Sequence, residues 1–122
     1  MDLVCPGCAM RSLRIQCALE LPANACYDEV QVQALTCSQC GLLAVGAYQE
    51  SRRGALGDES VHHGAYALTQ TGMQRLLALL QDCPEPDNPG CGCAAHQVFE
   101  GGDLPGILQR LGIGFLTYYP DI

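Results

Sequence analysis

Two matching Cys-x-x-Cys motifs constrain this chain more than any other feature of its sequence. The first is Cys5-Pro6-Gly7-Cys8, and the second is Cys37-Ser38-Gln39-Cys40. A Cys-x-x-Cys turn places two sulfurs on one side of a tight loop, and Zn²⁺ takes four such ligands at about 2.3 Å in a tetrahedron. The pair therefore predicts one zinc site made of Cys5, Cys8, Cys37 and Cys40. The alternative is that the two motifs bind nothing together.

The segment between the motifs has the alternation of apolar and polar residues that is typical of β-strands. Alternation over 10–20 and again up to Cys37 predicts two strands, and the Pro-Ala-Asn sequence after Leu21 predicts the turn between them. The midpoints of the motifs place the centre of this hairpin near residues 22 and 23. That register would put Cys17 nearly opposite Cys26. We expect both to be small buried side chains, with a redox pair as the alternative.

A second hairpin is predicted by strand-like segments at 42–49 and 59–68. The residues near its tip and along its second strand include acidic, basic, imidazole and phenol groups. They are Glu50, Arg52, Arg53, His62, His63 and Tyr66. A solvated hairpin tip with internal ion pairs is the favoured interpretation, and a polar functional site is the alternative. Adjacent residues of a strand face opposite sides, so His62 and His63 cannot both join one site.

The second half of the chain predicts two helices. Apolar residues at helical spacing mark residues 71–82, with Thr71 and Gln74 as a capping box. Residues 103–112 form the other helix, which Asp103 begins and Gly112 ends. Residues 113–119 then predict a strand or an extended arm. Its aromatic side chains are expected to complete the core, or to form a dimer or partner contact. They are Phe115, Tyr118 and Tyr119.

The stretch between these helices is unusual. Residues 83–96 contain three prolines and two glycines, which cannot form regular structure, together with Cys83, Cys91, Cys93 and His96. These side chains are enough for a second structural zinc site, and a helical turn after Cys93 would direct it and His96 to one metal. Free thiols, an iron–sulfur cluster, or replacement of His96 by one of the other histidines are the alternatives.

Length and charge narrow the possible classes of protein. The 122 residues fit a single domain (1–122), with a β part at 1–68 and a helical part at 69–122. The net charge is −7 with six basic residues, so binding of nucleic acid is not expected. Neither a signal segment nor a membrane span is evident. We therefore expect a cytoplasmic protein, where paired cysteines bind metal more often than they form disulfides.

Residues 5–41 resemble the zinc ribbon group, in which two Cys-x-x-Cys knuckles meet on a β-hairpin. The resemblance covers about a third of the chain, and it implies metal binding more specifically than any one function. Zinc ribbons serve in transcription machinery, ribosomal proteins and antitoxin N-terminal domains. This chain departs from the transcription-factor and antitoxin patterns because it has no helix-turn-helix signal and no basic face.

Together these patterns predict an α+β fold. It would comprise a zinc-ribbon antiparallel sheet extended by a second hairpin, then two helices and a second zinc-holding loop. Two zinc ions are the expected cofactors. Because no catalytic motif stands out, the leading hypothesis is a non-catalytic adaptor or regulator that binds a protein partner, with a homodimer possible. An enzyme or accessory subunit using the residues around 50–66, and a nucleic-acid-binding zinc ribbon, are the alternatives.

Overall fold

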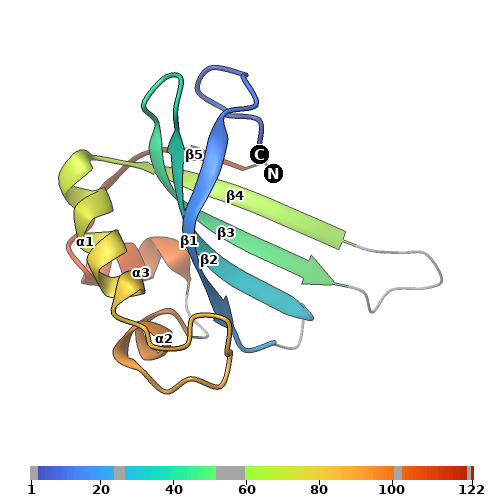
Figure 1. The fold of residues 1–122 in the computed structure, drawn as a ribbon, viewed down its shortest axis with the longest axis vertical. Helices are drawn as coiled ribbons and strands as arrows, with labels where there is room; N and C mark the ends of the chain where they lie inside the picture. The colour runs from blue at the N-terminus through green and yellow to red at the C-terminus, as the bar shows by residue number, and fades with distance from the viewer. Residues whose placement is uncertain (1–2, 24–26, 52–59, 101–102, 121) are drawn as a thin grey trace.

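The described residues of the chain form a five-stranded antiparallel sheet with three helices, so the predicted α+β class is confirmed (Figure 1). The structure is a computed structural model that describes residues 3–23, 27–51, 60–100, 103–120 and 122. The strands lie in the order β1-β2-β3-β4-β5. In chain order the elements are β1 (Leu13–Leu21), β2 (Glu29–Cys37), β3 (Leu43–Ser51), β4 (Ser60–Leu68), α1 (Gln70–Gln81), α2 (Ala94–Phe99), α3 (Leu104–Arg110) and β5 (Phe115–Tyr119).

The register of the first hairpin differs from the predicted one. Leu13 lies opposite Cys37, and Leu21 lies opposite Val30, so the centre of the hairpin falls beyond residues 22 and 23. The reason is that the chain folds back before β1, where Leu3 pairs with Leu13, so the first motif forms a turn of its own. The predicted pairing of Cys17 was wrong, because Cys17 lies opposite Ala34. Its proposed partner, Cys26, is outside the described residues.

The last strand joins the sheet from the far end of the chain. β5 pairs with β4, with Tyr118 opposite Tyr66, and it forms one edge of the sheet. The prediction that the aromatic tail completes the core was wrong for two residues, since Phe115 is 42% and Tyr118 48% exposed. An edge strand has a neighbour on one side only, so part of each ring stays in solvent. Tyr66 stacks on Tyr118 with ring centres 4.6 Å apart.

α1 begins earlier than its sequence suggests. Thr69 is the N-cap, and its hydroxyl accepts a hydrogen bond from the backbone N–H of Gly72 at 3.1 Å. The predicted cap, Thr71, lies inside the first turn. The predicted apolar face is confirmed, because Met73 and Leu76 are buried against the sheet. The short helix α2 is additional to the two that the sequence predicts.

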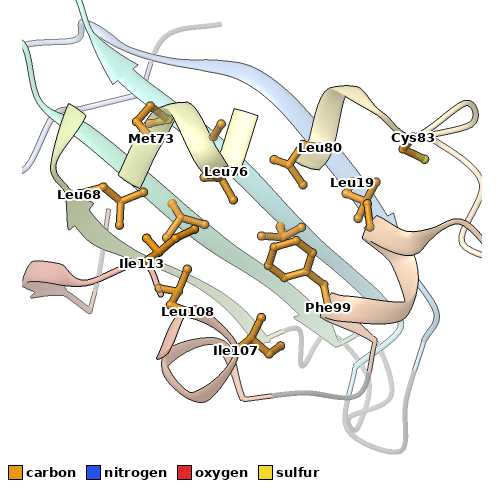
Figure 2. Close-up of a cluster of buried hydrophobic side chains, with 14 of the residues drawn as sticks. Leu19, Leu68, Met73, Leu76, Leu80, Cys83, Phe99, Ile107, Leu108 and Ile113 are labelled. Carbon is orange, nitrogen blue, oxygen red and sulfur yellow. The ribbon is translucent and has the colours of Figure 1, made fainter. Parts of the chain in front are cut away.

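The main core lies between the three helices and one face of the sheet. Figure 2 shows side chains of the helices and of β1 and β4 pointing into one layer. The labelled members are Leu19, Leu68, Met73, Leu76, Leu80, Cys83, Phe99, Ile107, Leu108 and Ile113. No described helix is long and apolar enough to cross a membrane.

A second, smaller apolar cluster lies outside this layer, at the end of the sheet that carries the two Cys-x-x-Cys motifs. Its buried members are Cys5, Leu13, Leu35, Cys37, Ala44 and Ala65. Two ligands predicted for the first metal site are therefore core residues as well.

Candidate metal centres

The two Cys-x-x-Cys motifs have the same backbone structure. In the first, Ala9 N–H donates to the Cys5 carbonyl at 2.8 Å, and Cys5 N–H donates to Met10. In the second, Gly41 N–H donates to the Cys37 carbonyl at 3.2 Å, and Cys37 N–H donates to the Leu42 carbonyl. Ala9 and Gly41 both have positive φ, 64° and 77°. Each motif is thus a tight turn that needs one left-handed residue after its second cysteine.

These turns bring the four predicted sulfurs together. Cys5 Sγ lies 3.6 Å from Cys40 Sγ, and Cys8 Sγ lies 3.7 Å from Cys37 Sγ. All four sulfurs lie within 4.8 Å of one another. In a tetrahedron with metal–sulfur bonds of about 2.3 Å, neighbouring sulfurs are separated by about 3.8 Å. The observed spacing is therefore compatible with a four-coordinate metal ion.

The first site also has donors that favour a thiolate. The Ser12 hydroxyl lies 3.0 Å from Cys37 Sγ and is itself buried. Backbone N–H groups of Gln39 and Cys40 donate to the same sulfur at 3.4 Å. The Cys40 N–H and the Ser12 hydroxyl lower the pKa of Cys37 to about 6. One ligand is therefore already a thiolate near neutral pH, the form that binds metal.

The second predicted group is also assembled. Cys83 Sγ lies 3.9 Å from Cys91 Sγ and 3.4 Å from His96 Nδ1, and Cys93 Sγ lies 3.2 Å from the same nitrogen. With bonds of about 2.3 Å to sulfur and about 2.0 Å to nitrogen, a tetrahedral site separates the two atoms by about 3.6 Å. The four ligand atoms lie within 4.8 Å of one another. His96, rather than His62 or His63, completes this group.

α2 explains how the local sequence positions two of these ligands. Cys93 is the N-cap of α2, and His96 lies one turn later with its backbone N–H 3.5 Å from Cys93 Sγ. The backbone N–H and the ring of His96 lower the pKa of the Cys93 thiol to about 6. Burial, followed by the sulfur of Cys93, raises the pKa of Cys83 to about 11. The second group thus also contains one readily ionised thiol beside one that metal must deprotonate.

The other ring nitrogen of His96 ties the group to the sheet. His96 Nε2 lies 2.9 Å from the carbonyl oxygen of Glu20, near the end of β1. Donation from Nε2 to that carbonyl leaves Nδ1 free of a proton and directed at the sulfurs, which is the usual arrangement of a metal-bound histidine. The Glu20 N–H donates to the Pro86 carbonyl at 2.8 Å, so the Pro-rich loop lies along the edge of β1.

The polar functional site that was the alternative interpretation of residues 50–66 is not assembled among its described members. His62 and Tyr66 line a cavity on the helix-covered face of the sheet. His63 lies on the opposite face, where its Nε2 is 2.7 Å from Gln33 Oε1. Glu50 Oε2 accepts a hydrogen bond from Tyr48 at 2.6 Å. The other two predicted members, Arg52 and Arg53, are outside the described residues.

Two features of functional interest were missed by sequence reasoning. Ser12 was predicted to lie in a strand, and no sequence signal marked its hydroxyl as a contact of Cys37 Sγ. The cavity beside β4 also gave no signal, because it combines Tyr27 and Asp103, which are distant in the sequence.

The N-cap role predicted for Asp103 is confirmed, since its carboxylate accepts a hydrogen bond from Gly106 N–H at 3.3 Å.

Comparisons of the chain with protein-family models, curated proteins and solved structures find no match in any of the three. The geometry described above is therefore the basis for any functional conclusion.

Proposed function

We propose that this chain is a two-zinc protein in which both ions are structural. The supporting observation is that each cluster offers four ligand atoms within 4.8 Å of one another. Sets of four thiolates, or of three thiolates and one imidazole, are typical of structural zinc. A catalytic zinc keeps one position open for water or substrate, and neither cluster leaves one.

The first site is proposed to be a zinc ribbon. Two equivalent turns carrying Cys5, Cys8, Cys37 and Cys40 support this, as does the antiparallel pairing of β1 with β2. The remaining elements would be additions to the ribbon, because β3, β4 and β5 extend the same sheet. Within this proposal the second zinc holds the loop that covers the β1 edge.

The biochemical role that we propose is that of a non-catalytic adaptor or regulator acting through protein contacts. Two closed metal sites and a net charge of −7 favour it over nucleic-acid binding. The exposed apolar side chains on β5 would supply contact area for a partner, since Leu116 is 69% exposed.

Metal analysis is the direct test of the zinc sites. We expect about two zinc ions per chain, falling to one in Cys8→Ser and to one in Cys91→Ser. Chelation should unfold a large part of the protein, because structural zinc contributes on the order of 10 kcal/mol to the folding of small domains. One zinc in the unmodified protein would disprove one of the two sites, and iron would disprove the proposed chemistry.

The adaptor role has a separate test. Protein recovered with the chain from its native host should be lost after chelation and in Cys91→Ser, but kept in Cys17→Ser. Cys17 is a half-buried cysteine outside both clusters, so it controls for the loss of a thiol alone. Recovery of the same partners by the metal-free protein would contradict a metal-dependent adaptor.

A further inference from the structure

A cavity of about 460 Å³ lies on the helix-covered face of the sheet, away from both cysteine clusters. Its floor is formed by strand residues that include Val32, Ala47 and Gly64, and the first turn of α3 closes one side. This volume is within the range of about 300–1,000 Å³ that is usual for small-molecule sites. None of the roles proposed above uses it.

Two residues that line the cavity from neighbouring strands, Ala47 and Gly64, are small. A Cβ atom at Gly64 would lie only 3.0 Å from the Tyr118 hydroxyl, so glycine allows the Tyr118 ring to cross β4. Ala47 lies directly opposite Gly64 on β3, and it adds little volume. A larger residue at Ala47 would therefore extend into the cavity, whereas a side chain at Gly64 would collide with the Tyr118 ring.

Aromatic rings provide much of the wall. Tyr66 and Tyr118 are stacked at 4.6 Å between ring centres, with 29° between their planes. Tyr27 and His62 meet edge to face at 6.0 Å. All four side chains line the cavity. The negative faces of such rings attract organic cations.

The charge of the cavity also favours a cation. Asp103 supplies a carboxylate, and no Lys or Arg is found among the described lining residues. The negative charge of the whole chain, −7, acts in the same direction. Burial, the neighbouring Tyr118 and the Asp103 charge together raise the pKa of Tyr66.

We infer that this cavity binds an organic ammonium group carried on a short apolar body. The carboxylate of Asp103 would pair with the ammonium, while Tyr27, Tyr66 and Tyr118 would contact its apolar body and its charge. The group could come from a free amine or from a lysine side chain of a partner protein. The inference does not depend on the zinc assignment, so a failed metal analysis would leave it standing.

The test is a titration of the full-length protein, as purified, with phenethylammonium, followed by amide NMR shifts. The neutral probe 2-phenylethanol and the anionic probe 3-phenylpropanoate are run in parallel. We expect the ammonium to bind about fivefold more tightly than the alcohol, the combined size of an exposed ion pair and a cation–π contact. Shifts should centre on β3 and β4 near Ala47 and Gly64.

Asp103→Asn is the decisive variant, because asparagine caps a helix about as well as aspartate but carries no charge. It should reduce the preference for ammonium over alcohol to about twofold, the part that a cation–π contact alone supplies, and leave the melting temperature unchanged. Glu100→Gln removes a nearby exposed charge that does not line the cavity, and it should keep the preference. Ala47→Leu should abolish binding of both probes by filling the floor.

The source of the group is distinguished by adding a lysine-containing tripeptide with blocked ends. Tighter binding of the peptide than of phenethylammonium would indicate a protein ligand, and the reverse order a free amine. Equal binding of ammonium and alcohol, preference for the anion, or no binding at all would each overturn the inference.

Discussion

The segments that carry the two cysteine clusters lie at opposite ends of β1 (Figure 1), and the two clusters are built in different ways. The first stands at the Leu13 end, on two turns with matching hydrogen bonds. The second stands at the Glu20 end, on an irregular loop followed by the six-residue α2. One site thus uses a repeated local motif, whereas the other depends on contacts with the sheet.

This difference determines what each metal would hold in place. The first group packs with a small apolar cluster that includes Cys5 and Leu13, apart from the main core. Cys83 belongs to the main core itself, where it lies with Leu80 and Phe99. Loss of the first metal should therefore release a turn at the edge of the molecule, while loss of the second should disturb the layer that holds the helices on the sheet.

The largest expected effect tests this contrast with one ligand from each site. Cys83→Ser should lower the melting temperature of the helical signal by more than about 10 °C, because it removes a metal and places a hydroxyl in the core. Cys8→Ser should leave that transition nearly unchanged. Hydrogen exchange should locate the damage, with Cys8→Ser exposing residues 3–12 and Cys83→Ser reducing protection across α1 and the sheet.

Cys17→Ser is the matched control, since Cys17 packs beside the main core but belongs to neither cluster. Cys17→Ser should lower the free energy of unfolding by roughly 1 kcal/mol or less. Equal loss of protection in Cys8→Ser and Cys83→Ser would show that the two sites are one cooperative unit, and the contrast would then be wrong.

A smaller effect concerns the groups that support the ligands. Ser12→Ala removes the hydroxyl next to Cys37 Sγ, and loss of such a partner typically weakens metal binding by about tenfold or more. The variant should also raise the pKa of Cys37 from its value of about 6. Protons would then compete with the metal for the Cys37 sulfur at higher pH. The midpoint of metal release from the first site should therefore move to higher pH.

The measurement is competition with a chromophoric chelator over a pH series. Ser38→Ala serves as the control, because Ser38 lies in the second motif with an exposed side chain. The second site should be unaffected in both variants, since its supporting contact is the backbone carbonyl of Glu20. A shift at both sites would indicate that the two metals are coupled through β1.

The same contrast explains what the sequence could predict. Both groups of residues that could hold a metal were predicted because cysteine spacing limits which sulfurs can reach one ion. His96 was included because a helical turn separates it from Cys93. The presence of the strands and of the two longer helices was predicted from the periodicity of apolar residues. For example, the spacing of Met73 and Leu76 predicted the buried face of α1.

Register and long-range packing could not be predicted in this way. The fold-back that pairs Leu3 with Leu13 moved the β1–β2 turn, and no local pattern marks that bridge. The pairing of β5 with β4 joins residues about fifty positions apart. The exposure of Phe115 and Tyr118 depends on this pairing, which no local sequence pattern indicates. The cavity near Asp103 arises from the same distant contacts.

The smallest expected effect tests whether the two turns of the first site are equivalent. Ala9 has a φ of 64°, a conformation that costs an L-residue roughly 1 kcal/mol or more, whereas Gly41 adopts 77° without that cost. A Cβ at Gly41 would meet nothing within 4 Å, so Gly41→Ala introduces backbone strain alone. We expect Gly41→Ala to lower the stability of the first site by about 1 kcal/mol and Ala9→Gly to raise it by up to about the same amount.

Urea unfolding of the metal-loaded protein, followed by metal release from the first site, measures both changes. The double variant carrying Ala9→Gly and Gly41→Ala exchanges the two residues between the turns and is the most informative comparison. If the turns are equivalent, it should match the unmodified protein within about 0.5 kcal/mol, as expected for additive changes. A large loss in the double variant would mean that the second turn carries more of the site than the first. That result would break the equivalence inferred from the matching hydrogen bonds, because the position of the left-handed residue, and not only its presence, would then control the stability of the site.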